Sequence, residues 1–250
     1  MKVVYYKEYS HYLKRFMEFK MFGNQGKPCL VFAPQNGRFY DFENFDMVHV
    51  TSEFVESKRL CYICVDSIDE ETFSCVKEDP ALRILKHEAW VSYIIEELIP
   101  SVKEKLNYQG SFMSTGCSMG GMHAMNFFLR YPMIFDAVIS LSGIYSASYF
   151  FHDYIDELVF KNSPIDYLKS KSDDHPHLAL YRQHQIIACV GQGAYEDDMI
   201  QSLNKLQEIF ENKQIPAWID YWGYDVNHDW VWWKKQLPYF LSVIFKQPKI

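Results

Sequence analysis

A serine between two glycines is the first group in the sequence that could do covalent chemistry. The run reads Gly116-Cys-Ser-Met-Gly-Gly121 and lies between an apolar strand candidate, 112–115, and a helical stretch that begins near Met122. Glycines on both sides allow the sharp strand-to-helix turn that holds a serine hydroxyl above a sheet. The N–H groups of the following helix point to where an oxyanion would form. The pattern predicts Ser118 as a nucleophile; the alternative is an ordinary glycine-rich packing turn.

A serine hydroxyl needs a base within hydrogen-bonding distance to take its proton. His228 is the best placed of the nine histidines, because it lies in a loop between a strand-like segment, 217–221, and the last helical stretch. A histidine after the last strand, following serine and acid in chain order, is typical of this kind of nucleophile. The alternative is that His228 caps the final helix with Asp229. His123 is expected to pack or to join a polar network, and a metal site at 175–177 is the weaker interpretation of that loop.

The third group needed is a carboxylate that orients the imidazole ring. Three consecutive acids follow the strand candidate 186–190. Glu196 is the first choice and Asp197 the second, while Asp198 is expected to cap the helix that follows. Two lesser candidates lie in or just after the next strand: Asp220 and Asp225.

Strand candidates and helical stretches alternate along the chain, and they must bring these groups together. Apolar runs typical of buried strands lie at 29–33, 60–65, 112–115, 137–141 and 186–190. Helical patterns lie at 84–106, 120–131, 198–213 and 231–245. This alternation predicts an α/β fold: a mostly parallel central sheet with helices on both faces and ligands beyond the carboxyl ends of the strands. Alternating polar and apolar residues over 2–22 predict an N-terminal β-hairpin.

The chain is expected to form a single domain over residues 1–250, because its length suits one α/β domain and it contains neither repeats nor a low-complexity linker. One segment, 142–184, separates two strand candidates by about 40 residues, and loops of that length are usually functional or contain helices of their own. We therefore predict an excursion at 142–184 that covers the active site.

Composition and charge exclude several classes of protein. The chain has 250 residues, of which 48% are hydrophobic and 23% charged, so it is too apolar for a disordered segment. A net charge of -7 lacks the basic surface that nucleic-acid binding needs. The sequence has no apolar run long enough to span a membrane, and residues 1–10 do not resemble a secretory signal. We therefore expect no nucleic-acid or membrane partner and a cytoplasmic location, while a homo-oligomer stays open.

Six cysteines lie in apolar runs and are interpreted as buried, reduced thiols. Only the spacing of Cys61 and Cys64 indicates a metal or redox site. Both lie in the strand candidate 60–65, where residues three apart point to opposite faces of a sheet. No metal site is predicted.

Several blocks of the sequence resemble the putative esterase (esterase D-like) family of the α/β-hydrolase superfamily, which also contains feruloyl esterases and mycolyltransferases. The blocks are 116–124, 129–136, 141–143, 162–164, 191–197 and 222–230. The resemblance extends from about residue 25 to the end of the chain. It implies an α/β-hydrolase fold without a cofactor, with Ser118, Glu196 and His228 at the positions of a catalytic triad. It also implies acyl-ester hydrolysis or acyl transfer on a small-molecule ester.

The oxyanion hole is where the sequence departs from many lipases and esterases. Those enzymes carry a His-Gly-Gly-Gly-type segment after an early strand, and the corresponding stretch here is Pro34-Gln-Asn-Gly-Arg38. The backbone N–H of Met119 is expected to be one donor, because it follows the nucleophile. The second donor is expected at Asn36 or at its neighbour Gly37. Arg38 is suited either to a substrate carboxylate or phosphate or to a structural ion pair.

Aromatic residues cluster in the segments expected near the site, and such walls suit aryl esters or sugar faces. The alternative is that most of them fill the core. Residues predicted to bind substrate are Arg38, Tyr40, Tyr145 and Trp230. The sequence therefore predicts a serine carboxylic-ester hydrolase that works through an acyl-enzyme. The alternatives are an acyltransferase or serine peptidase with the same three residues, or a non-catalytic binding protein on a hydrolase scaffold.

Overall fold

The N-terminal segment forms the antiparallel hairpin that its alternating pattern predicts. In the computed structural model, which describes residues 1–246, β1 (Val3–Ser10) pairs with β2 (Arg15–Phe22) along their whole length. Side chains of β1 alternate between exposed and half-buried positions, so one face of the hairpin meets solvent. β2 also pairs with β4 (Leu60–Val65), again antiparallel, and this pairing joins the hairpin to the main sheet.

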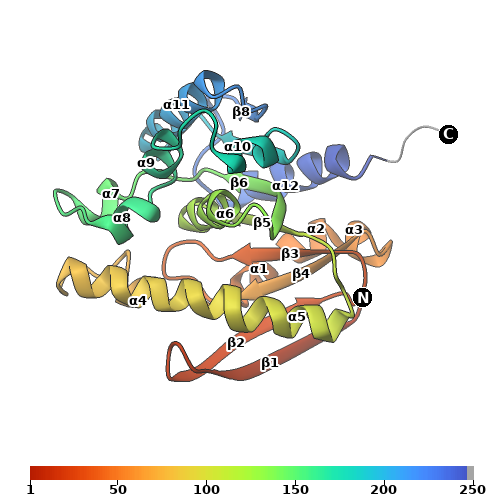
Figure 1. Ribbon diagram of the computed structural model, residues 1–250. Coiled ribbons are helices and arrows are strands. Elements are labelled where there is room, and N and C mark those ends of the chain that lie inside the picture. Colours follow the sequence, from red (N-terminus) through yellow and green to blue (C-terminus); the bar gives the residue numbers. More distant parts are fainter. Residues whose placement is uncertain (247–250) are drawn as a thin grey trace.

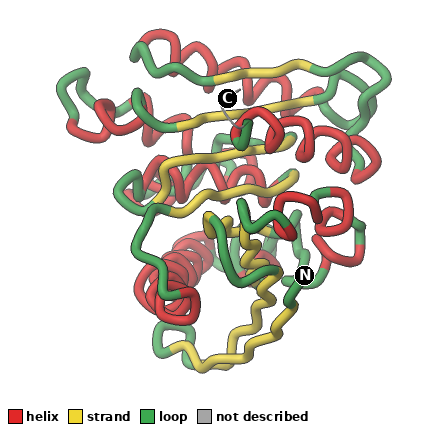
Figure 2. The backbone as a smooth tube through the Cα atoms, turned by 90° about the vertical axis from the view of Figure 1, so that its right-hand side faces the viewer, coloured by secondary structure: helices red, strands yellow, loops and turns green. Residues whose placement is uncertain are grey.

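The remaining strands are parallel and extend the sheet in the order β1-β2-β4-β3-β5-β6-β7-β8 (Figures 1 and 2). They are β3 (Lys27–Phe32), β5 (Phe112–Cys117), β6 (Phe135–Leu141), β7 (Gln185–Val190) and β8 (Trp218–Tyr221). Every residue of β4 and β5 is buried, which explains why these strands read as continuous apolar runs. The loops after β5, β7 and β8 therefore meet at one edge of the sheet, where parallel strands end.

One face of the sheet is covered by helices from the middle of the chain and by the helix that follows β7 (Figure 1). They are α4 (Pro80–Ser92), the π-helical η2 (Tyr93–Leu98), α5 (Ile99–Leu106), α6 (Met119–Arg130) and α11 (Asp197–Asn212). The sequence predicts one helix over 84–106, and the structure has three consecutive helical segments there. Pro100 lies at the start of α5, where it has no N–H to donate to the preceding turn, and the wider π-helical segment comes just before it.

The other face is covered by α12 (Trp230–Ile244) and by three short helices that follow β3. These are α1 (Asp41–Asn44), α2 (Met47–Val50) and α3 (Ser52–Glu56). The short 3-10 helix η1 (Asp69–Glu71) follows β4 and lies on the opposite face, against α4 and α6. Cys61 packs on the α4 and α6 side of the sheet and Cys64 on the α12 side, as the strand interpretation predicts. Burial raises the pKa of the Cys61 thiol to about 12 and that of Cys64 well above its usual value, so neither is a reactive thiolate near neutral pH.

The segment 142–184 is built from four short helices. They are α7 (Ser148–Phe151), α8 (Glu157–Lys161), α9 (Pro164–Lys169) and α10 (Pro176–Tyr181). Phe151 and Val159 from this segment pack in one apolar cluster with Met119, the residue after Ser118. The excursion therefore supports the start of α6, while its role as a cover over the active site stays a prediction. Among residues 1–246, no helix is long and apolar enough to cross a membrane.

Candidate active site

Ser118 occupies the turn between β5 and α6 in a backbone conformation that few serines adopt. Its φ is 57° and its ψ is -127°. The Ser118 N–H donates to the carbonyl of Leu141 at 2.8 Å, and the Ser118 carbonyl accepts from the N–H of Gly121 at 2.9 Å. Strained residues of this kind persist where the surrounding structure holds them, and they are concentrated at functional sites.

The two glycines that flank Ser118 are required because other backbone atoms lie against them. A Cβ on Gly116 would lie 2.8 Å from the carbonyl oxygen of Phe32 and closer still to that of Gly120. A Cβ on Gly120 would lie 2.5 Å from the carbonyl oxygen of Ala33 and closer still to that of Phe32. The turn is therefore packed directly on the end of β3, and no side chain fits at either position.

His228 lies between Ser118 and an acid. Its Nε2 is 2.9 Å from Ser118 Oγ, and its Nδ1 is 3.2 Å from Glu196 Oε2. An ionised carboxylate only accepts hydrogen bonds, so Nδ1 carries the ring proton and Nε2 presents a lone pair to the serine hydroxyl. The helix cap belongs to Asp229 alone, whose carboxylate accepts from the N–H of Val231 at 3.1 Å.

Glu196 is the acid that meets His228. Its side chain is buried, whereas Asp197 and Asp198 are exposed in the first turn of α11. The prediction that Asp198 caps this helix is wrong, because α11 already begins at Asp197 and Glu196 occupies the cap position, where its side chain makes no bond to the helix. Asp220 accepts from the Trp222 indole at 2.9 Å.

The loops that carry Glu196 and His228 are bonded to each other. The N–H of Gly193 donates to the carbonyl of Val226 at 2.8 Å, and the N–H of Ala194 donates to Asn227 Oδ1 at 2.8 Å. The N–H of His228 donates back to the carbonyl of Ala194 at 3.0 Å. Because three hydrogen bonds join the two loops, the acid and the base are held at a constant separation.

Some backbone N–H groups near Ser118 already have hydrogen-bond partners, and this limits which of them can form the oxyanion site. Met119 is the first residue of α6, so its N–H has no partner within the helix. The N–H of Gly37 donates to the carbonyl of Pro34 at 2.8 Å, and that of Arg38 donates to Asp41 Oδ2 at 2.9 Å. The N–H of Asn36 makes no hydrogen bond with any residue that the structure describes, and Asn36 has a φ of 59°. Of the two sequence candidates, only Asn36 keeps a free donor.

Arg38 is neutralised by two carboxylates. Its guanidinium group donates to Asp66 Oδ1 at 2.6 Å and to Glu18 Oε2 at 3.0 Å. The hydrogen bond that Arg38 donates to Asp66 raises the pKa of Arg38, while burial raises the pKa of Asp66 despite the ion pair. Of the two roles open for Arg38, the structure shows the ion pair. Arg38 and Asn36 also line a groove of about 530 Å³, which Tyr40 borders with an exposed ring.

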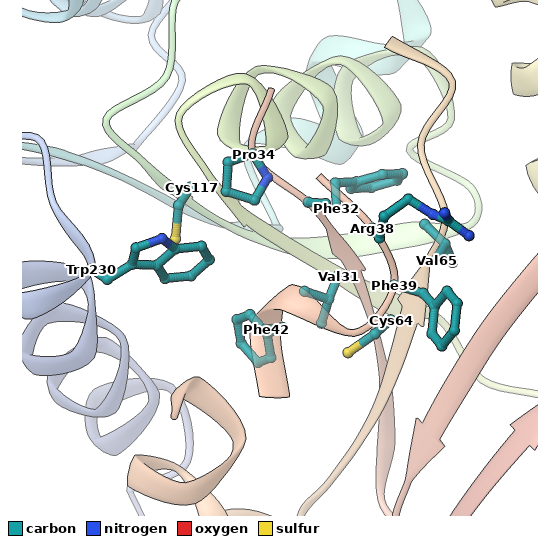
Figure 3. Close-up of a pocket in the computed structure, with 11 residues that line it drawn as sticks. Val31, Phe32, Pro34, Arg38, Phe39, Phe42, Cys64, Val65, Cys117 and Trp230 are labelled. Atoms are coloured by element: carbon teal, nitrogen blue, oxygen red, sulfur yellow. The ribbon is translucent and has the colours of Figure 1, made fainter. Parts of the chain in front are cut away.

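Trp230 lines a smaller and more enclosed cavity on the other side of β3. Figure 3 shows its ring beside Cys117 and facing Phe42 across the space, with Arg38 farther away. The ring also stacks on Phe45, with the two centroids 4.4 Å apart. Trp230 therefore forms part of an apolar wall close to the end of β5.

Tyr145 requires a correction, because it does not lie where a substrate could touch it. The side chain is fully buried, its hydroxyl lies 2.8 Å from Ser140 Oγ, and its backbone N–H donates to Ser202 Oγ at 2.7 Å. A tyrosine whose hydroxyl finds a partner inside the protein can bury its whole ring. The prediction that Tyr145 binds substrate is therefore wrong.

Two residues at the site were not predicted from the sequence. The hydroxyl of Ser142 donates to Glu196 Oε1 at 2.6 Å, and the indole N–H of Trp233 donates to Ser142 Oγ at 3.1 Å. Ser142 lies in one of the blocks noted above, directly after β6, whereas Trp233 has no sequence signal that separates it from a core residue. His123 joins a buried polar pair with Asp69 at 3.0 Å, as expected for a polar-network residue.

Comparisons with known proteins identify the family. The model of the family described as "Putative esterase" matches residues 14–242. No curated protein matches the chain. Among solved structures, a ferulic acid esterase superposes with a TM-score of 0.76 at 17% identity over 97% of both chains. The S-formylglutathione hydrolase FrmB from Staphylococcus aureus has a TM-score of 0.73 at 12% identity, over 97% of this chain and 96% of that one. An S-formylglutathione hydrolase from Agrobacterium tumefaciens has a TM-score of 0.75 at 14% identity, over 96% of this chain and 93% of that one.

Fold and family agree with each other. At these identities the structural matches show the fold alone, which is the mostly parallel sheet with helices on both faces described above. The family match includes both the turn of Ser118 and the loop of His228. The chain therefore has an α/β-hydrolase fold, belongs to the Putative esterase family and is a carboxylic ester hydrolase.

Proposed function

We propose that this protein hydrolyses small carboxylic esters through a covalent acyl-enzyme on Ser118, with His228 as the general base and acid and Glu196 as the triad acid. One observation carries the proposal. Ser118 Oγ, both ring nitrogens of His228 and the buried carboxylate of Glu196 form a continuous chain of hydrogen bonds of 2.9 and 3.2 Å. This is the arrangement that activates a serine hydroxyl.

In the acylation step, Ser118 Oγ attacks the ester carbonyl carbon while its proton moves to His228 Nε2. The resulting imidazolium ion is stabilised by Glu196, whose carboxylate is held at Nδ1. When the tetrahedral intermediate collapses, the bond to the alcohol oxygen breaks and His228 returns the proton to that oxygen. A water molecule then attacks the acyl-enzyme by the same route, with His228 as base, and frees the carboxylic acid.

Negative charge on the tetrahedral intermediate needs donors that are already in place. The backbone N–H groups of Met119 and Asn36 are our candidates, because neither has a partner within residues 1–246 and both belong to segments packed at the end of β3. Removal of one such donor commonly costs about 3–4 kcal/mol of transition-state stabilisation. Since these are backbone groups, their position depends on the glycine turn and on the loop after β3.

The substrate class follows from the two spaces beside the site. The groove near Asn36 has a polar floor and the aromatic edge of Tyr40, and the smaller cavity at Trp230 is apolar. The cavity at Trp230 has a volume of only about 10 Å³, which is too small for a ring, so we propose an ester of modest size with an aryl or sugar face that packs on Tyr40 in the groove. One neighbour is named as a ferulic acid esterase, which is consistent with an aryl ester.

The test is covalent labelling with a fluorophosphonate probe, combined with hydrolysis of p-nitrophenyl acetate. Wild-type protein should be labelled, Ser118→Ala should lose the label completely, and His228→Ala should label far more slowly. Ser242→Ala is a suitable control, because Ser242 lies on the exposed side of α12 and bonds only to the carbonyl of Tyr239 at 2.7 Å. A folded Ser118→Ala variant that keeps its label, or hydrolyses the ester at the wild-type rate, would overturn the proposal.

A further inference from the structure

We infer that Trp233 is a positioning residue that sets both the acid and the base of the site, acting on Glu196 through Ser142 and on His228 by ring contact. The inference rests on the proposed function, because it assigns a role to residues that contact Glu196 and His228. Trp233 is buried in α12, in the cluster that covers that face of the sheet. Trp233 is not among the residues that line the groove at Asn36 or the cavity at Trp230.

The first contact determines where the Ser142 hydroxyl points. An indole N–H can only donate, so at 3.1 Å it occupies a lone pair of Ser142 Oγ. The single hydroxyl proton of Ser142 is then directed to Glu196 Oε1 at 2.6 Å. As a result, both carboxylate oxygens of Glu196 are bonded, one by Ser142 and the other by His228.

The second contact sets the plane of the imidazole. The rings of Trp233 and His228 meet edge to face, with centroids 5.0 Å apart and an interplanar angle of 87°. Edge-to-face contact is a preferred geometry of aromatic rings and adds to the energy of burial. The tryptophan therefore supports the imidazole on the side away from solvent while its N–H acts on the acid.

Ser142 itself is held in place by the fold rather than by its own preference. It lies at the end of β6 with a φ of 51°, a left-handed conformation that serine seldom adopts, and it is fully buried. Its N–H donates to the carbonyl of Cys189 at 2.7 Å, at the end of the neighbouring strand β7. Strain of this kind is retained where the surroundings determine the conformation. In this conformation the Ser142 hydroxyl lies within hydrogen-bonding distance of Glu196 Oε1.

The experiment compares two pairs of matched variants in steady-state ester hydrolysis. Trp233→Phe keeps an aromatic ring but removes the five-membered ring of the indole with its N–H donor, while Ser142→Ala removes the link to Glu196. Trp90→Phe is the control for the first, because the Trp90 indole donates a bond of similar length, 3.0 Å, to the carbonyl of Asp66 on the opposite face of the sheet. Ser114→Ala is the control for the second, because buried Ser114 donates to the carbonyl of Ala124 at 3.0 Å.

We expect kcat to fall about threefold to tenfold in Trp233→Phe and about 10- to 100-fold in Ser142→Ala, which loses a bond to a charged group. KM should change by less than about twofold, because neither residue meets the substrate. The controls should keep the wild-type kcat even where their thermal stability falls. The NMR resonance of the proton between His228 and Glu196 should shift in Trp233→Phe and stay unchanged in Trp90→Phe.

A folded Trp233→Phe variant with wild-type kcat and an unshifted resonance would overturn the inference, as would a Trp90→Phe variant with the same loss of kcat. If Ser142→Ala does not fold, Trp233→Phe decides the question alone, because Trp90→Phe removes the same atoms and one indole hydrogen bond elsewhere in the core. Failure of the proposed function looks different. In that case the wild-type protein itself neither hydrolyses the ester nor takes up a fluorophosphonate label.

Discussion

Replacing Glu196 by glutamine tests the site most directly, because the substitution keeps the shape of the side chain while it removes the negative charge and turns one acceptor into a donor. Ser142 donates to Glu196 Oε1 at 2.6 Å, so an amide at this position must turn its oxygen toward Ser142. Its NH2 group then faces His228 Nδ1, which in the native protein donates to the carboxylate oxygen Oε2 at 3.2 Å. A donor at that point forces Nδ1 to accept and moves the ring proton to Nε2.

The consequence for the rate can be worked out from this rearrangement. With a proton on Nε2, His228 cannot accept the proton of Ser118, although the distance between Nε2 and Ser118 Oγ is still close to the native 2.9 Å. Loss of the correct tautomer in a serine-histidine-acid site costs about 10⁴-fold in kcat, which corresponds to about 5.4 kcal/mol. We therefore expect Glu196→Gln to lose roughly 10³- to 10⁴-fold in kcat with a nearly unchanged KM.

The assay is p-nitrophenyl acetate hydrolysis with circular dichroism to confirm folding. Asp197→Asn is the matched control, since Asp197 is the adjacent exposed acid and makes no contact with His228. It should retain the wild-type rate. A Glu196→Gln enzyme within tenfold of wild type would refute the tautomer argument, and so would an Asp197→Asn enzyme with the larger loss.

Three further outcomes follow from the packing and charge of the fold. Gly120→Ala should fold poorly and unfold at clearly lower urea concentration, since its Cβ would overlap the backbone at Phe32; an unchanged urea midpoint would contradict this. The next outcome concerns His87, which is fully buried and whose two ring nitrogens have no partner among residues 1–246. Burial lowers the pKa of His87 well below its usual value, and the nearby His123 lowers it further. Above about pH 6.5 the His87 ring is neutral in both the folded and the unfolded chain. Below that pH only the unfolded chain takes up a proton on this ring, so the free energy of unfolding should fall by up to about 1.4 kcal/mol for each unit by which the pH is lowered. His87→Phe should remove that part of the slope in urea titrations from pH 7 to 5, and an unaltered slope would exclude His87 as its source. Because both carboxylate partners neutralise Arg38, the groove has no free cation among its lining residues. An ester with an anionic leaving group should therefore show a kcat/KM roughly tenfold below its neutral analogue at low salt, with the gap closing as salt is added; equal values at low salt would rule out this electrostatic effect.

The sequence by itself determined those features that depend on neighbours along the chain. The hairpin at β1 and β2 follows from alternation of polar and apolar residues, and the buried strands follow from short apolar runs. The turn at Ser118 follows from glycines at fixed spacing, because only they allow the backbone of β5 and α6 to approach β3 so closely. Local conformation and side-chain period carry this information, so it can be read without the fold.

The partners of these groups were decided only by tertiary structure. The choice of Glu196 over Asp197 depends on hydrogen bonds between two loops that follow β7 and β8. Burial of Tyr145 depends on a serine offered by β6, and the ion pairs of Arg38 depend on β2 and on the residue after β4. The contact between Trp233 and Ser142 joins the last helix to the end of β6, 91 positions apart. Such contacts come from the order and register of parallel strands, which bring the ends of distant segments to one edge of the sheet, and no spacing along the chain encodes which atoms meet there.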